Sequence, residues 1–155
     1  MNTKEITVKV TGYDSRTYPS DTSVSSILQD IDSSLANNAV AAKVNGQLWD
    51  WNRSVESDAE LSPVYADSEE GHSLLLHSAA HLMAQSVKDY FPDAQMTIGP
   101  AIENRFYYDF DVERPFSDED LEKIENGMRE HSAANYSVKR DKIGVKEAKK
   151  LLKGK

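Results

Sequence analysis

The chain has 155 residues with 39% hydrophobic and 28% charged side chains, which excludes a disordered protein, and its net charge of −8 argues against wrapping nucleic acid over its whole surface. It contains no cysteine, which excludes disulfides, thiolate metal sites and a cysteine nucleophile. Because it also has no apolar run near the roughly 20 residues of a membrane span and no secretory signal pattern, we expect a cytoplasmic location and no membrane contact.

The first elements predict a hairpin followed by a helix. Residues 6–10 alternate apolar and polar side chains as a half-buried strand does, and residues 16–19 return after a turn. Residues 20–22 are good N-cap residues and precede a single helix. Its apolar side chains recur at helical spacing and form one stripe: Val24, Ile27, Leu28, Ile31 and Leu35.

A second hairpin completes the first unit. Residues 40–44 are a predicted strand, and Asn45-Gly46 is the strongest hairpin signal in the sequence, leading into a strand over residues 47–51. A last strand over residues 61–66 closes the unit. We therefore predict an α+β fold of the β-grasp (ubiquitin-like) type for residues 1–66, with a small sheet over one helix.

A linker and a long helix open the second unit. Residues 67–71 contain no large apolar side chain and are the predicted linker. A helix over residues 72–91 follows, and Pro92 ends it. One face of this helix is apolar, with further residues that widen it: Leu76, Ala80, Met83, Val87 and Tyr90, then Leu75, Ala79 and Leu82. We assign residues 72–155 to this second α+β unit.

Short elements fill the remaining sequence. We predict a strand over residues 95–98 and a continuous strand over residues 106–112, in which apolar and polar side chains alternate. Residues 117–120 form a capping box with an acidic first turn, which we interpret as structural, for a helix carrying Leu121, Ile124 and Met128. Residues 136–142 are a predicted strand, and residues 145–153 a short basic helix.

Charge is spread unevenly along the chain. Residues 1–71 hold 5 basic and 12 acidic side chains, whereas residues 139–155 hold 8 basic and 2 acidic ones. Two interpretations of this basic tail stay open, a solvated helix and a surface that faces RNA. If it faces RNA, Lys149 and Lys150 are the candidate contacts.

The best chemical feature is the pair His77 and His81. Positions i and i+4 of a helix lie one turn apart on the same side, so both imidazoles can reach one substrate or ion. Zinc sites often use this spacing, but position 78 is serine where a zinc protease has glutamate. From spacing alone, three interpretations stay open: structural or surface histidines, catalytic or substrate-binding histidines, and metal ligands.

Other candidates carry weaker signals. Ser78 is adjacent to His77 on a helix, so the two side chains point apart and do not form a nucleophile–base pair. Tyr107 and Tyr108 are expected to be mostly strand core. Trp49 and Trp51 share a face of their predicted strand and are either core or an exposed platform for a partner. No glycine-rich phosphate loop is present, so no ATP site is recognisable.

Taken together, these segments resemble threonyl-tRNA synthetases. The second unit is similar to the start of the editing domain of that family through residues 77–82 (HSAAHL), 96–100 (MTIGP) and 104–109 (NRFYYD). The first unit is similar to the TGS domain that precedes it, including residues 44–46 (VNG) and the connection over residues 67–71. A helical HxxxH alone is weak, but the three motifs in this order are specific.

The resemblance implies a function for the pair. The family joins threonine to tRNA(Thr) with ATP, and its editing domain hydrolyses seryl-tRNA(Thr). A second sieve is needed because one methyl group is worth only about 1–3 kcal/mol in a pocket. By resemblance, His77 and His81 position the ester, the terminal ribose or the attacking water, Tyr108 lines the pocket, and no metal is expected there.

The resemblance also has limits. Arg105 stands where the family commonly has glycine, and Ala79 where cysteine is frequent. The family's later lysine and Cys-x-x-x-His, which complete the editing pocket, are not in this chain, nor are the domains that carry ATP, magnesium and zinc and form the homodimer. We therefore expect the N-terminal part of a larger enzyme, inactive by itself. A TGS-containing module that binds RNA or protein without catalysis, and a metal-dependent hydrolase, are the alternatives.

Overall fold

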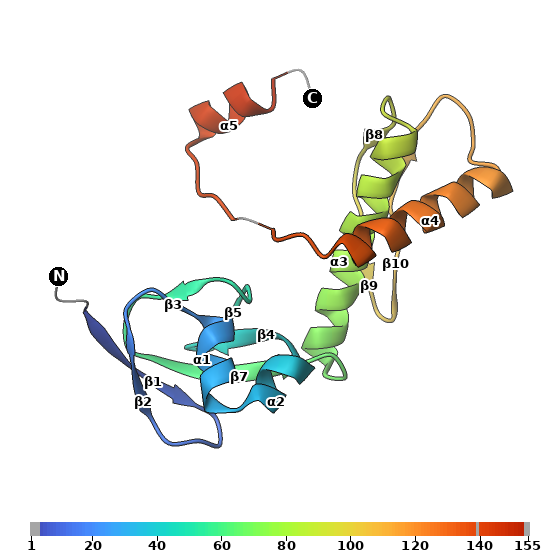
Figure 1. The fold of residues 1–155 in the computed structure, drawn as a ribbon. Coiled ribbons are helices and arrows are strands. Elements are labelled where there is room, and N and C mark those ends of the chain that lie inside the picture. Colours follow the sequence, from blue (N-terminus) through green and yellow to red (C-terminus); the bar gives the residue numbers. More distant parts are fainter. Residues whose placement is uncertain (1–3, 139, 154–155) are drawn as a thin grey trace.

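The protein consists of two units, and the second begins with one long helix. The computed structural model describes residues 4–138 and 140–153 (Figure 1). No helix within these residues has both the length and the hydrophobicity needed to cross a membrane.

The first unit is a mixed five-stranded sheet over two short helices. Its elements are β1 (Glu5–Val10), β2 (Arg16–Pro19), β3 (Thr22–Ser23), α1 (Val24–Ile31), α2 (Ser33–Asn38), β4 (Ala39–Val44), β5 (Gln47–Trp49), β6 (Ser54–Val55) and β7 (Ala59–Tyr65). The strand order is β2-β1-β7-β4-β5, with β1 and β7 parallel and the other pairs antiparallel. This arrangement confirms the predicted α+β, β-grasp fold.

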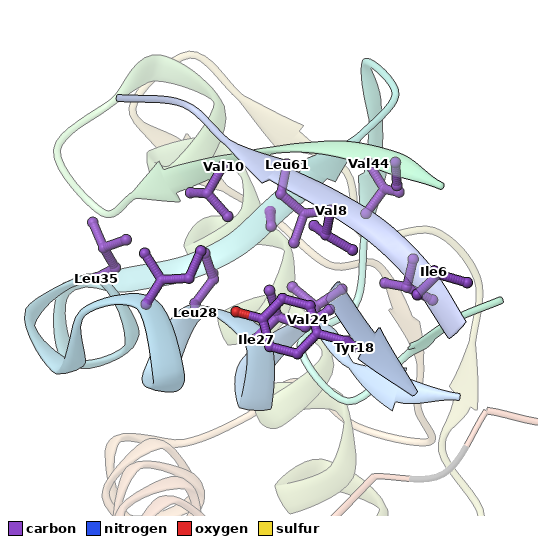
Figure 2. Packing of buried hydrophobic residues seen from close by; sticks show 14 residues of the cluster. Ile6, Val8, Val10, Tyr18, Val24, Ile27, Leu28, Leu35, Val44 and Leu61 are labelled. Atoms are coloured by element: carbon purple, nitrogen blue, oxygen red, sulfur yellow. The ribbon is translucent and has the colours of Figure 1, made fainter. Parts of the chain in front are cut away.

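One apolar core lies between the sheet and α1 (Figure 2). In β1 every second side chain is buried, as the period of a strand requires. The stripe predicted for the helix faces these side chains. The largest of its fully buried side chains are Ile6, Val8, Val10, Val24, Ile27, Leu28, Val55 and Leu61.

The predicted single helix is two helices. Asp32 has φ −161° and ψ 117°, so it ends α1, and its carboxylate then caps α2 by accepting a 2.8 Å hydrogen bond from the Ser34 N–H. The N-cap of α1 is Ser23 rather than a residue of the range 20–22. The cause is the bridge between β3 and β6, which draws Thr22 into extended backbone.

The second hairpin forms at Asn45-Gly46. Both residues have positive φ, 50° and 79°, which the tight turn requires and which glycine and asparagine tolerate best. The returning strand stops at Trp49 instead of residue 51, and the last strand begins at Ala59 rather than residue 61. Residues 52–58 carry the short strand β6, which was not predicted.

The second unit is built on two packed helices. It contains α3 (Glu69–Tyr90), β8 (Gln95–Met96), β9 (Ala101–Ile102), β10 (Arg105–Phe106), β11 (Phe110–Asp111), α4 (Asp118–Ala134) and α5 (Val145–Leu151). The predicted linker over residues 67–71 is wrong in its second half, because α3 begins at Glu69 with Ser68 as its N-cap. The helix ends at Tyr90, just before Pro92 as predicted.

The predicted strand over residues 106–112 is interrupted. β10 pairs with β9 in a hairpin that turns through Glu103 at φ 51°, whereas β11 pairs with β8. The chain changes partner between Phe106 and Phe110, which breaks the strand. Thr97 and Ile98 still exchange backbone hydrogen bonds with Asp109, so the pairing of the predicted strand over residues 95–98 continues beyond β8.

The capping box of α4 is confirmed. The Ser117 hydroxyl accepts a hydrogen bond from the Asp120 N–H, and the Asp120 carboxylate accepts one from the Ser117 N–H at 2.9 Å. Arg114 binds this carboxylate with two nitrogens, at 2.5 and 3.2 Å. The guanidinium and then the Ser117 N–H hold the pKa of Asp120 well below its ordinary value.

The segment after α4 differs from the prediction. Residues 136–138 and 140–142 are irregular, so the predicted strand over 136–142 is wrong for the described residues, and Lys139 lies outside them. None of the described residues in this range pairs with a strand. The basic helix is confirmed as α5, although it ends at Leu151.

The second unit has a small core. Val87, Ala94 and Ile124 are its buried centre. Ser86 is fully buried and donates a 2.7 Å hydrogen bond to the Ile124 carbonyl, which joins α3 to α4. Tyr90, predicted to face the core, is 43% exposed.

Candidate functional site

His77 and His81 lie in contact on the exposed side of α3. Their Nε2 atoms are 3.0 Å apart, and the rings meet edge to face with centroids 4.5 Å apart. In such a contact one ring donates its N–H and the other accepts, so at least one imidazole is neutral. The Nδ1 atom of each ring takes no part in this contact.

Helix α3 presents this pair to solvent because its opposite side packs. Ala80, Ala84 and Val87 are buried, whereas both histidines are exposed. Ser68 caps the first turn, and Glu69 and Glu70 are acidic residues next to the positive end of the helix dipole. Both histidines therefore lie outside the buried core of the second unit.

Ser78 does not take part in the pair. Its hydroxyl donates a 2.9 Å hydrogen bond to the Leu74 carbonyl one turn back, which is a common arrangement for serine within a helix. Ala79 is half-buried beside it, and Arg105 is exposed at the start of β10. Neither departure from the family pattern displaces the histidines from their contact.

Tyr108 packs elsewhere than against the histidines. Its ring stacks on Phe110, with centroids 4.9 Å apart and an interplanar angle of 18°. A Cβ at Gly99 would lie 2.0 Å from this ring, so glycine is required in the IGP motif for a close approach. Tyr108 makes no hydrogen bond to His77 or His81. Tyr107, expected to be mostly core, is 45% exposed.

Lys149 and Lys150 are in the last turn of α5. Both are exposed, and no side chain of α5 is buried. Figure 1 shows α5 apart from α4. The two lysines are thus on a separate element from the histidine pair.

Trp49 and Trp51 are half-buried and pack against the first core. The Arg53 guanidinium carbon lies 3.4 Å from the centroid of the Trp49 ring, a cation–π contact. A groove of about 1130 Å³ runs beside them, and its lining comes from both units, including Leu74, Ser78 and Arg140. The two tryptophans are therefore neither fully core nor a free platform.

A polar cluster between α3 and α4 was not predicted. His131 Nε2 lies 2.6 Å from Asp89, and its Nδ1 lies 3.3 Å from Gln85, which accepts a 2.6 Å hydrogen bond from the Tyr136 hydroxyl. Gln85 and Asp89 have the same i, i+4 spacing as the histidine pair. His131 reaches Gln85 and Asp89 because α3 packs on α4. The sequence pattern does not predict that packing.

Side chains that could bind a metal ion do not gather into a centre within the described residues. Among residues 4–138 and 140–153, no group of three or more His, Cys, Asp or Glu side chains is placed to hold an ion. In the histidine pair the two Nε2 atoms already face each other, so an ion between them would have to displace their hydrogen bond.

Parts of the chain match a known protein domain and known enzymes in sequence. The model of the TGS domain matches residues 7–62. The threonine–tRNA ligase of Magnetococcus marinus is 50% identical over 127 residues, which are 81% of this chain and 20% of that protein. The chain is similar in sequence to part of these threonine–tRNA ligases.

Other ligases of this class agree. The threonine–tRNA ligase of Citrifermentans bemidjiense is 42% identical over 150 residues, covering 97% of this chain and 24% of its own length. That of Hyphomonas neptunium is 44% identical over 133 residues, 86% of this chain and 20% of its own length. The chain thus spans less than a quarter of the length of these relatives. The match over residues 7–62 confirms the predicted resemblance of the first unit to a TGS domain.

Proposed function

We propose that the chain is the N-terminal region of a threonine–tRNA ligase and that its second unit contributes to hydrolytic editing of seryl-tRNA(Thr). The observation that supports this most is the exposed His77–His81 contact on α3, in a chain whose relatives are threonine–tRNA ligases. Water attack on an aminoacyl ester needs a group that takes up a proton and groups that orient the ester.

The pair has the atoms for both tasks. When both rings are neutral, the ring that donates through Nε2 keeps a lone pair on Nδ1, and the ring that accepts keeps an Nδ1–H. The pair then offers one acceptor for a water or hydroxyl proton and one donor for an ester or ribose oxygen. Tyr108 would line the pocket through its ring rather than through a hydrogen bond to the histidines.

The partners follow from this proposal. They are tRNA(Thr) and mischarged seryl-tRNA(Thr), held with help from the basic tail, with the acidic first unit acting as a spacer or specificity element. Exposed lysines are suited to phosphate contact. If Lys149 and Lys150 each contact a phosphate, K149E/K150E in the whole enzyme lowers the slope of log affinity against log salt by about 2. An unchanged slope would remove these lysines from the interface.

The rest of the enzyme is expected outside this chain. ATP, magnesium and zinc would be used by other domains, homodimer formation would also lie there, and the location would be cytoplasmic. The chain covers 20–24% of its relatives' lengths. We accordingly expect the isolated chain neither to activate threonine nor to deacylate seryl-tRNA(Thr) efficiently.

The test uses the longer enzyme and preformed seryl-tRNA(Thr). H77A and H81A are expected to lower the deacylation rate by about 10²-fold, the usual contribution of a positioned acid or base, and to leave threonylation unchanged. S78A is the matched control, because its hydroxyl binds only its own helix. Wild-type deacylation in both histidine variants would contradict the proposal.

The alternative is a binding module without catalysis. It is favoured by the TGS match and by the groove beside Trp49 and Arg53. Reading the gene beyond Lys155 separates the two: continuation into a synthetase catalytic core supports the enzyme, and a stop codon supports the module. A stoichiometric zinc ion in the purified protein would instead favour the metal-dependent hydrolase.

A further inference from the structure

The connection between the two units is a short joint held by hydrogen bonds of Ser68. Strand β7 ends at Tyr65 and α3 begins at Glu69. The Tyr65 carbonyl accepts hydrogen bonds from the Ser68 N–H at 3.1 Å and from the Ser68 hydroxyl at 2.6 Å. That hydroxyl in turn accepts one from the Gly71 N–H at 3.1 Å. A single serine therefore ties the end of the sheet to the first turn of the helix.

Gly71 makes the joint tight. It is buried, and a Cβ built on it would lie 1.9 Å from the Tyr65 carbonyl oxygen and 2.7 Å from its carbon. Its φ is not positive, so glycine is needed here for the close approach of two backbones rather than for an unusual conformation. A methyl group at this position would have to push the helix away from the strand.

A second contact lies nearby. Lys43 of β4 forms a 2.6 Å ion pair with Glu70 of α3. Both side chains are partly exposed, so the pair adds little free energy, but it joins the helix to a second strand. Strands β7 and β4 are neighbours within the five-stranded sheet, so α3 is attached at its interior rather than at an edge.

We propose that Ser68 and Gly71 are positioning residues that hold α3, and with it His77 and His81, in one fixed direction relative to the first unit. His77 follows Gly71 by six residues, about 9 Å along a helix. The contacts of the joint are the evidence for this fixed direction. The further idea that the direction places the histidine pair against a tRNA ester rests on the proposed function.

Spin labels measure this direction in the chain as it exists. The chain has no cysteine, so E60C on β7 and K123C on α4, both exposed positions, accept labels selectively. Pulsed electron paramagnetic resonance should give one narrow distance distribution for the parent. In G71A we expect the distribution to shift or to broaden about twofold, because the helix must leave the Tyr65 carbonyl.

G144A is the matched control. The same substitution at Gly144 meets no atom within 4 Å, so the distance distribution should stay as in the parent. Tryptophan fluorescence verifies the first unit, since both tryptophans pack there. Should G71A fail to fold, S68A is expected to broaden the distribution and S68T, which keeps the hydroxyl, to restore it.

Three results would overturn the proposal: a broad distribution in the parent, an unchanged distribution in G71A, or an S68A effect that S68T does not reverse. These outcomes are independent of editing activity. Normal deacylation rates in both H77A and H81A, with the expected distances, would contradict the proposed function and leave the joint intact.

Discussion

The two units differ in how completely they bury their apolar side chains. The first unit closes one core of fourteen buried residues between sheet and helix, whereas the second has a core of three, Val87, Ala94 and Ile124, rimmed by half-buried side chains. Most large exposed apolar side chains also lie in the second unit, including Ile98, which is 56% exposed. Apolar side chains recur at helix or strand spacing in both units, so periodicity predicts an element without predicting that its apolar face is covered.

The difference has an energetic consequence. Burial of apolar area is the main favourable term in folding, so the first unit has most of the stabilisation of this chain. The second unit depends more on helix capping, on the α3–α4 contact and on the joint to the first unit. The chain should therefore unfold in two steps, with the second unit opening first.

A core substitution should separate the two units most strongly. L61A removes a fully buried side chain of the first core and is expected to lower the free energy of unfolding by about 3 kcal/mol. L121A, at a leucine that is 53% exposed on α4, should cost less than about 0.5 kcal/mol. Urea unfolding measures both losses, followed by tryptophan fluorescence for the first unit and by far-UV circular dichroism for the helices of the second. Equal losses in the two variants would contradict the comparison.

The contact between α3 and α4 should show the next largest effect. A Cβ at Gly127 would lie 2.3 Å from the Ser86 hydroxyl and 2.9 Å from the Tyr90 ring. G127A gains about 1 kcal/mol of helix propensity, but it forces the helices apart, for a net loss of about 1–2 kcal/mol. Thermal unfolding followed by far-UV circular dichroism should show an earlier helical transition. The fluorescence transition of the first unit should stay in place, and its displacement would mean that the units unfold together.

A smaller effect should appear at acid pH. Arg114 and Ser117 lower the pKa of Asp120 in the folded protein. The ionised carboxylate therefore stabilises the second unit above its ordinary pKa of about 4, and this contribution is lost as the pH falls through the lower folded pKa. D120N should make the helical transition less dependent on pH below about 4. D118N, which removes a charge at the same helix start, is the control, and an identical pH response in both variants would contradict the account.

Much of the first unit was predictable because its signals are local. The alternation of residues 6–10, the spacing of Val24 to Ile31 and the Asn45-Gly46 turn each depend on neighbouring residues. The β3–β6 bridge joins residues about thirty positions apart. It explains why the N-cap of α1 is Ser23 and not a residue of the predicted range 20–22. Such pairings depend on tertiary contacts that no local pattern contains.

The candidate site was predictable only in part. The i, i+4 spacing gave the contact of His77 and His81, because helix geometry alone brings the two rings together. The close approach of the Tyr108 ring to Gly99 and the His131 cluster depend on how separate elements pack. The close approach at Gly71 was missed for the same reason, since a glycine between polar residues has the pattern of a linker.

Hydrogen exchange, read by mass spectrometry on the whole chain, tests the contrast between the units most directly. We predict slow exchange throughout β1, β4, β7 and α1, because these elements open only when the first unit unfolds. Exchange should be markedly faster in β8 to β11 and fastest in α5, with α3 most protected near the joint at Ser68 and Gly71. Equal protection in the two units would contradict the account.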